Sequence, residues 1–180
     1  MIRVLNVISD TNIGGAGRVI LNYLRYADSS RFETWAAVPR GSLLKAPLEE
    51  AGARVLEVDG MADRSYHKED VKALKELIRR ERPDLVHTHG ALSGRIAARQ
   101  CGVPVVYSRH SAFPVPAKLR YPPGRWVNKW LNEHYADRII AVSPATAENL
   151  TDGGISPKKI TIVMNGVAPV VPDDAGRVHP

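Results

Sequence analysis

Short apolar runs rich in β-branched residues alternate with amphipathic stretches along almost the whole chain. The runs predict seven strands, over residues 3–8, 32–38, 54–58, 85–88, 103–107, 139–142 and 160–163. Apolar residues three and four positions apart predict helices between them, around residues 19–24, 71–78, 90–99, 126–135 and 145–150. Such alternation is typical of an α/β fold with a parallel sheet, because each parallel neighbour needs a crossover connection. We therefore predict a doubly wound, mostly parallel Rossmann-like sheet with strand order 3-2-1-4-5-6-7 and helices on both faces.

The size and composition of the chain favour one domain with anionic partners. Its 180 residues fit a single domain, and no apolar run approaches the roughly 20 residues of a membrane-spanning helix. The amino terminus lacks the features of a signal peptide, and the lone Cys101 suits a reducing compartment, so we expect a cytoplasmic protein. The net charge of +6 favours anionic partners. Because the alternation stops at Asn165, we expect a domain over residues 1–168 and an interdomain linker over residues 169–180.

Polar residues and glycines gather where the predicted sheet would bind a ligand. Doubly wound sheets bind ligands at the carboxyl ends of their strands, where the strand order reverses. Here that point lies between the first and fourth strands. The residues that follow the first, fourth, fifth and sixth strands there are Gly14, Gly15, His87, His89, Arg109, His110 and Ser143.

Gly14 and Gly15 precede an amphipathic helix, and two interpretations stay open. Free N–H groups at a helix amino end can bind a phosphate, and glycines let the ligand approach closely. The alternative is a tight strand-to-helix turn. A dinucleotide fingerprint fits poorly, because Ile20 stands where it needs Gly or Ala and the second strand continues into Pro39 and Arg40 instead of an acidic residue.

His87 and His89 lie two residues apart, so their side chains share one face of a strand. They could ligate a metal or line the mouth of a cleft. We expect no metal, because no Cys or carboxylate stands at ligand spacing. His110 follows the fifth strand directly, where it could bind a sugar hydroxyl or be an ordinary hydrogen-bonded histidine.

Two segments are basic. Residues 118–135 combine cationic and aromatic side chains, a mixture that suits a lipid–water interface, an anionic acceptor or nucleic acid. We predict that Trp126 and Trp130, four apart on a helix, pack onto the domain while the basic rim binds peripherally. The second segment is a basic helix, which we expect to be a solvated face. Its cations are Lys72, Lys75, Arg79, Arg80 and Arg82.

Four motifs stand in a fixed order along the chain. The first follows strand one and includes Gly14, Gly15 and Arg18, and the second is Arg82-Pro83-Asp84-Leu85-Val86-His87-Thr88-His89-Gly90. The third is Tyr135-Ala136-Asp137-Arg138-Ile139-Ile140-Ala141-Val142-Ser143, and the last is Ile162-Val163-Met164-Asn165-Gly166-Val167. Together they resemble the amino-terminal domain of retaining, GT-B-fold glycosyltransferases of the family 4 group, over residues 1–168.

The resemblance implies the acceptor-binding half of a hexosyltransferase that uses a nucleotide-diphosphate sugar as donor substrate, without metal or cofactor. The donor would bind to a missing carboxyl-terminal domain, and residues 165–167 would begin the hinge. Gly14 and Gly15 would lie near the donor phosphates and the acceptor, and His110 beside the reacting sugar. Gly17 departs from the family, which often has Glu there. The substrate-binding set implied is Gly14, Gly15, Arg18, His87, His89, Arg109 and Ser143, with His110 catalytic.

The leading hypothesis is therefore sugar transfer to a glycan, lipid-linked or small-molecule acceptor, with retention, and with this fragment inactive alone. The partners implied are a donor-binding domain and an acceptor. Peripheral contact with anionic lipid on the inner face of a membrane is expected, and no specific nucleic acid. The alternative is a stand-alone Rossmann-like module that binds a phospholigand without catalysis.

Overall fold

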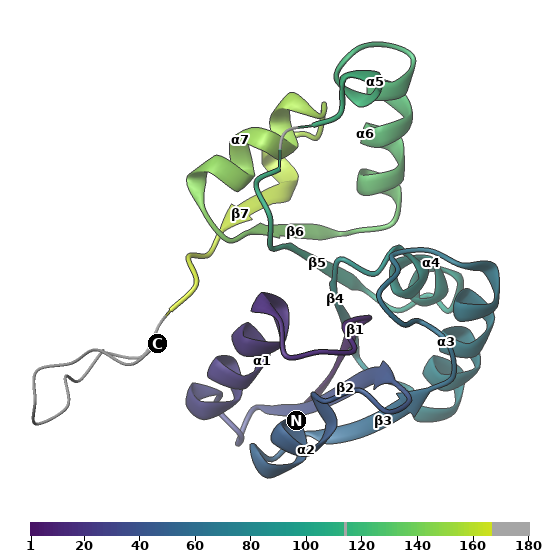
Figure 1. The fold of residues 1–180 in the computed structure, drawn as a ribbon, viewed down its shortest axis with the longest axis vertical. Coiled ribbons are helices and arrows are strands. Elements are labelled where there is room, and N and C mark those ends of the chain that lie inside the picture. Colours follow the sequence, from purple (N-terminus) through teal and green to yellow (C-terminus); the bar gives the residue numbers. More distant parts are fainter. Residues whose placement is uncertain (114, 167–180) are drawn as a thin grey trace, which may run out of the picture.

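The computed structural model describes residues 1–113 and 115–166, which form one parallel seven-stranded sheet in the order β3-β2-β1-β4-β5-β6-β7 (Figure 1). Every neighbouring pair is parallel. The fold class and strand order expected from the alternation are both confirmed. The strands are β1 (Ile2–Ile8), β2 (Phe32–Pro39), β3 (Arg54–Val58), β4 (Leu85–His89), β5 (Val105–Arg109), β6 (Arg138–Ala141) and β7 (Ile160–Ile162).

The crossover connections are helical. Each expected helix is present, and two short ones were missed, α2 and α5, because four or six residues carry too little periodicity to detect. The helices are α1 (Gly15–Tyr26), α2 (Lys45–Glu50), α3 (Lys68–Glu81), α4 (Leu92–Gln100), α5 (Ala117–Arg120), α6 (Gly124–His134) and α7 (Pro144–Asp152), with a 3-10 turn η1 (Pro157–Lys159).

The two faces of the sheet pack against different helices. Successive strand residues point to opposite faces, so Val7 of β1 belongs to the core under α3 and α4, whereas Ile8 belongs to the core under α1 and α2. Leu74 and Ile78 of α3 are fully buried in the first of these cores, and Ile20 of α1 is fully buried in the second. A third, smaller cluster around Ile139 joins β6 to α7.

Helix α6 contradicts one expectation. Trp126 and Trp130 are 66% and 55% exposed, so the predicted packing of these rings onto the domain is wrong. The face of α6 that contacts the domain is polar instead: Asn128 Nδ2 donates to the carbonyl oxygen of Gly153 at 2.8 Å. The Trp spacing of four correctly identified a shared face, but spacing does not say which face of a helix the domain covers.

The carboxyl end of the described chain runs back toward α1. Asn22 of α1 donates from Nδ2 to the carbonyl oxygen of Gly166 at 3.3 Å. The expected linker over residues 169–180 and the last hinge residue, Val167, lie outside the described residues.

Candidate acceptor site at the strand-order reversal

A cavity of about 750 Å³ opens at the carboxyl ends of β1, β4 and β5, where the strand order reverses. Its walls come from the β1–α1 loop, the start of α4, the end of β5 and one face of α6. The position is the one that the doubly wound topology predicted. The charged and histidine side chains that line it are those of Asp10, His89, Arg95, Arg109 and His110, and Gly15 lines it with its backbone.

The β1–α1 loop brings the amino end of α1 to this cavity. Thr11 fixes the loop, since its backbone N–H and its hydroxyl donate to the two carboxylate oxygens of Asp63 at 3.0 and 2.6 Å. Gly14 is the N-cap of α1 and provides no side-chain cap. The first N–H groups of the helix are therefore available to a ligand, and they carry the positive end of the helix dipole.

Packing explains why position 17 holds a glycine where the resembled family often has Glu. It is buried in α1, and a Cβ built on it would collide with Cδ2 of Leu44. A glutamate cannot occupy this position without displacing Leu44, which is itself fully buried.

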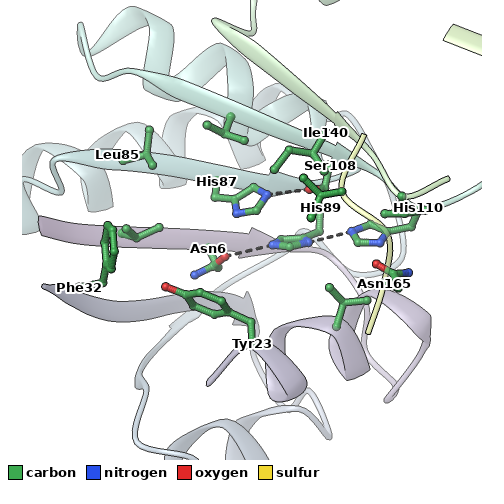
Figure 2. A pocket seen from close by; sticks show the side chains of 15 residues that line it. Asn6, Tyr23, Phe32, Leu85, His87, His89, Ser108, His110, Ile140 and Asn165 are labelled. Atoms are coloured by element: carbon green, nitrogen blue, oxygen red, sulfur yellow. Dashed lines mark hydrogen bonds between the residues drawn. The ribbon is translucent and has the colours of Figure 1, made fainter. Parts of the chain in front are cut away.

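A directed chain of hydrogen bonds joins Asn6, His89 and His110, and all three also line a smaller neighbouring cavity, which Figure 2 shows. Asn6 Nδ2 donates to the carbonyl oxygen of Trp35 at 3.3 Å, which leaves Asn6 Oδ1 as the acceptor facing His89 Nε2 at 3.1 Å. His89 Nε2 therefore carries the proton. Its Nδ1 must accept, so His110 Nε2 is the donor across 2.9 Å. This assignment leaves His110 Nδ1 as a buried acceptor without a partner among the described residues.

All three histidines of this region are held neutral. Burial and, to a smaller extent, the nearby His110 lower the pKa of His87 from 6.5 to about 4. Burial also lowers the pKa of His89 well below 6.5, and that of His110 below 6.5. The directed chain requires a neutral His89, because an imidazolium has no nitrogen that can accept, and the lowered pKa of His110 leaves its Nδ1 as an acceptor.

His87 lies on the same strand face as His89, as expected, with ring centroids 4.4 Å apart. Its Nε2 forms a hydrogen bond with Ser108 Oγ at 2.8 Å. It lines a second, apolar cavity of about 340 Å³, which Tyr23, Phe32 and Ile140 border on the same side of the sheet (Figure 2).

Five of the eight predicted site residues lie at or beside the larger cavity, and of the other three only His87 lines the smaller cavity. Gly15, His89, Arg109 and His110 line the larger cavity, and Gly14 caps the helix beside it. Arg18 is exposed on α1 and lines neither of the two cavities. Ser143 is the N-cap of α7, where its Oγ accepts from the backbone N–H of Thr146 at 3.2 Å, a structural role.

The sequence-based prediction missed Asn6 and Arg95. Asn6 is the polar residue that interrupts the apolar run Val4–Ile8 of the first strand, and that interruption was a usable signal. Arg95 gave no signal of its own, because one arginine within a helix is most often solvated.

Within residues 1–113 and 115–166, no group of three His, Cys, Asp or Glu side chains is arranged to hold a metal ion. In the same ranges no helix is long and apolar enough to cross a membrane.

The sequence profile described as Glycosyltransferase Family 4 matches residues 13–170. The chain belongs to glycosyltransferase family 4. A curated relative from Escherichia coli, UDP-Gal:alpha-D-GlcNAc-diphosphoundecaprenol alpha-1,3-galactosyltransferase, is 33% identical over 102 residues, which are 53% of this chain and 26% of the relative.

Solved structures share the fold of this family 4 chain. The Anabaena protein HepE, in complex with UDP and glucose, superposes with a TM-score of 0.71 at 18% identity, over 93% of this chain and 45% of HepE. A glycosyltransferase from Rickettsia africae gives a TM-score of 0.73 at 18% identity, over 92% of this chain and 43% of its own. The chain thus spans less than half the length of these relatives.

Proposed function

We propose that this chain forms the acceptor side of a retaining glycosyltransferase that uses a nucleotide-diphosphate sugar. The observation that carries the proposal is the cavity at the strand-order reversal, because the amino end of α1 and His110 meet there. Family membership supports sugar transfer as the reaction class. A carboxyl-terminal domain, which is not part of these 180 residues, would bind the donor nucleotide.

Two parts of the cavity have distinct roles in this proposal. The free N–H groups after Gly14 and Gly15 would lie against the phosphates of the donor, where the helix dipole favours negative charge. His110 would accept a hydrogen bond at Nδ1 from a hydroxyl of the reacting sugar. The chain through His89 supports this role, since it fixes the proton of His110 on Nε2.

The acceptor is proposed to be carried on a lipid. The E. coli relative acts, by its name, on a sugar linked to diphosphoundecaprenol. The rings of Trp126 and Trp130 on α6 are exposed, and the exposed Arg120 and Arg125 lie close to them in the sequence, a mixture that suits the surface of an anionic membrane. Cytoplasmic, peripheral placement follows from this proposal.

A donor-consumption assay tests the reaction. UDP release from a panel of UDP-sugars, UDP-galactose included, is measured with the 180-residue chain alone and with the chain joined to a donor-binding domain. We expect acceptor-dependent turnover only from the joined protein, because transfer requires donor and acceptor in one near-attack geometry. Robust turnover by the chain alone would refute the half-enzyme proposal, and tight phospholigand binding without turnover by the joined protein would favour the non-catalytic module.

The role of His110 is tested in the same joined protein. H110A is expected to lower turnover by about tenfold or more, because a hydrogen bond to the reacting sugar is lost, with a small change in melting temperature. H134A, on the exposed side of α6, is the matched control and should keep full turnover.

The proposal also requires no metal. Elemental analysis of the purified chain should give substoichiometric metal, and turnover should persist in excess chelator. One equivalent of zinc that survives dialysis would contradict this part.

A further inference from the structure

One arginine is buried in the wall of the larger cavity without an acidic partner. Arg95 of α4 is 6% exposed. Its guanidinium carbon lies 4.2 Å from the centroid of the Tyr107 ring, and its Nη1 donates to Asn132 Oδ1 at 2.9 Å. Its Nε is buried and donates to no group in the described part of the chain, where no ion pair joins Arg95 to a carboxylate.

A second cation faces the same cavity. Arg109, at the end of β5, donates from Nε to the carbonyl oxygen of Ser111 at 3.0 Å and has no carboxylate partner in the described ranges. Burial lowers the pKa of Arg95; the nearby Tyr107 opposes this shift, and the positive charge of Arg109 adds to it. Two guanidiniums thus line one cavity without a carboxylate partner in the described ranges, and a buried cation without a counter-charge is costly to a folded domain.

Asp10, the acidic residue that lines this cavity, does not neutralise the charges of Arg95 and Arg109. Asp10 lies at the end of β1, on the wall formed by the β1–α1 loop, and no ion pair joins it to Arg95 or Arg109. Its pKa is raised by burial and by the nearby Asp63, as expected of a carboxyl group that lacks a cationic neighbour. The other polar side chains near the two arginines are neutral, among them Asn128 and Asn132 of α6 and Ser111.

We propose that Arg95 and Arg109 form a subsite for a phosphate or diphosphate group of the acceptor. The proposal rests on the proposed function, since it assigns the ligand of the acceptor side. Guanidinium groups bind phosphate oxygens through pairs of parallel hydrogen bonds, and the bound anion would supply the missing counter-charge.

The position of the subsite distinguishes it from the place proposed for the donor. Arg95 is on α4 and its partner Asn132 is on α6, whereas the donor phosphates are proposed to lie at the amino end of α1. His89 at the end of β4 and His110 directly after β5 also line the cavity, and β4 and β5 lie between β1 and β6 in the sheet. An acceptor phosphate held by the arginines would therefore place the attached sugar toward His110.

Inorganic pyrophosphate, titrated calorimetrically into the 180-residue chain at constant ionic strength, tests the subsite. R95M keeps an apolar contact with the Tyr107 ring but removes the charge. We expect its Kd for pyrophosphate to rise by about tenfold or more, since charge-assisted hydrogen bonds are lost. Without ligand, R95M should melt at a higher temperature than the wild type, because an uncompensated buried charge is gone.

The control is R79Q, which removes a charge from the exposed last turn of α3 and should change neither quantity. If R95M binds pyrophosphate as tightly as the wild type, the subsite is refuted. If R95M melts at a lower temperature without ligand, Arg95 is structural and the proposal is again overturned.

Two further probes separate the acceptor from the donor. Glucose 1-phosphate presents a sugar phosphate, and UDP presents the diphosphate of the donor. We expect R95M to weaken binding of glucose 1-phosphate and to leave UDP binding unchanged. If only UDP binding depends on Arg95, the assignment to the acceptor is wrong. None of these measurements needs turnover, so their outcome is independent of the transfer assay.

Discussion

The buried neutral state of His87 predicts a specific loss of stability in acid. Its pKa is 6.5 in an unfolded chain and about 4 in the folded one, because burial penalises the imidazolium. The folded state therefore binds fewer protons than the unfolded state between these two values. By linkage, the stability that depends on neutral His87 is complete above pH 6.5 and is lost progressively as the pH falls toward 4.

The magnitude follows from the same two values. A pH of 5 lies 1.5 units below the pKa of 6.5 of the unfolded imidazole, which is therefore mostly protonated. The folded imidazole, with its pKa of about 4, is still mostly neutral. At roughly 1.36 kcal/mol per unit, protonation of the unfolded state costs about 2 kcal/mol of the free energy of unfolding. H87Q removes this contribution, and its amide can retain the hydrogen bond to Ser108.

Urea unfolding of the wild type and H87Q at pH 7 and pH 5 is the measurement. The free energy of unfolding of the wild type should fall by about 2 kcal/mol more than that of H87Q between the two pH values. His89, His110 and Asp10 titrate in both proteins, so the difference isolates position 87. Equal losses in the two proteins would refute the conclusion that His87 is buried and neutral.

Three other outcomes follow from the structure. G17A should lower the free energy of unfolding by about 1–3 kcal/mol, because its Cβ collides with Leu44. G15A is the control and should cause no such loss, since no atom lies within 4 Å of its new Cβ. Equal losses in the two variants would contradict the packing at position 17. D70N should lower the free energy of unfolding by about 2 kcal/mol, since buried Asp70 accepts two hydrogen bonds from Arg64. Urea unfolding measures this loss, and an unchanged free energy of unfolding would exclude a stabilising ion pair. In vesicle sedimentation, the chain should bind anionic lipid and release it at high salt; equal binding to neutral vesicles would rule out an electrostatic cause.

The backbone of the site could be predicted from the sequence, whereas the network inside it could not. The alternation of apolar runs and helices fixed a parallel sheet, and the reversal of strand order then placed the cavity after β1, β4 and β5. His87 and His89 shared a face, as their spacing required. The contact of His89 with Asn6, 83 positions away, had no local signal, because it depends on the register of β1 against β4.

Local periodicity also failed where the surroundings decide burial. The spacing of Trp126 and Trp130 is the same whether the domain or solvent covers them, and the structure leaves them exposed. Arg95 shows the opposite case. An arginine is expected at the surface, but this one is enclosed between its own helix α4, the Tyr107 ring and Asn132 of α6.

The sequence by itself determined the order of the strands, the side of the sheet on which each residue lies and the edge at which a ligand would bind. These are set by periodicity, which acts over a few residues, and by the handedness of crossover connections, which acts within one strand–helix–strand unit. Only the tertiary structure decided which side chains lose water and which charges remain unpaired. Burial is a property of what packs over a residue, and for Arg95 and His110 those neighbours come from other helices and strands.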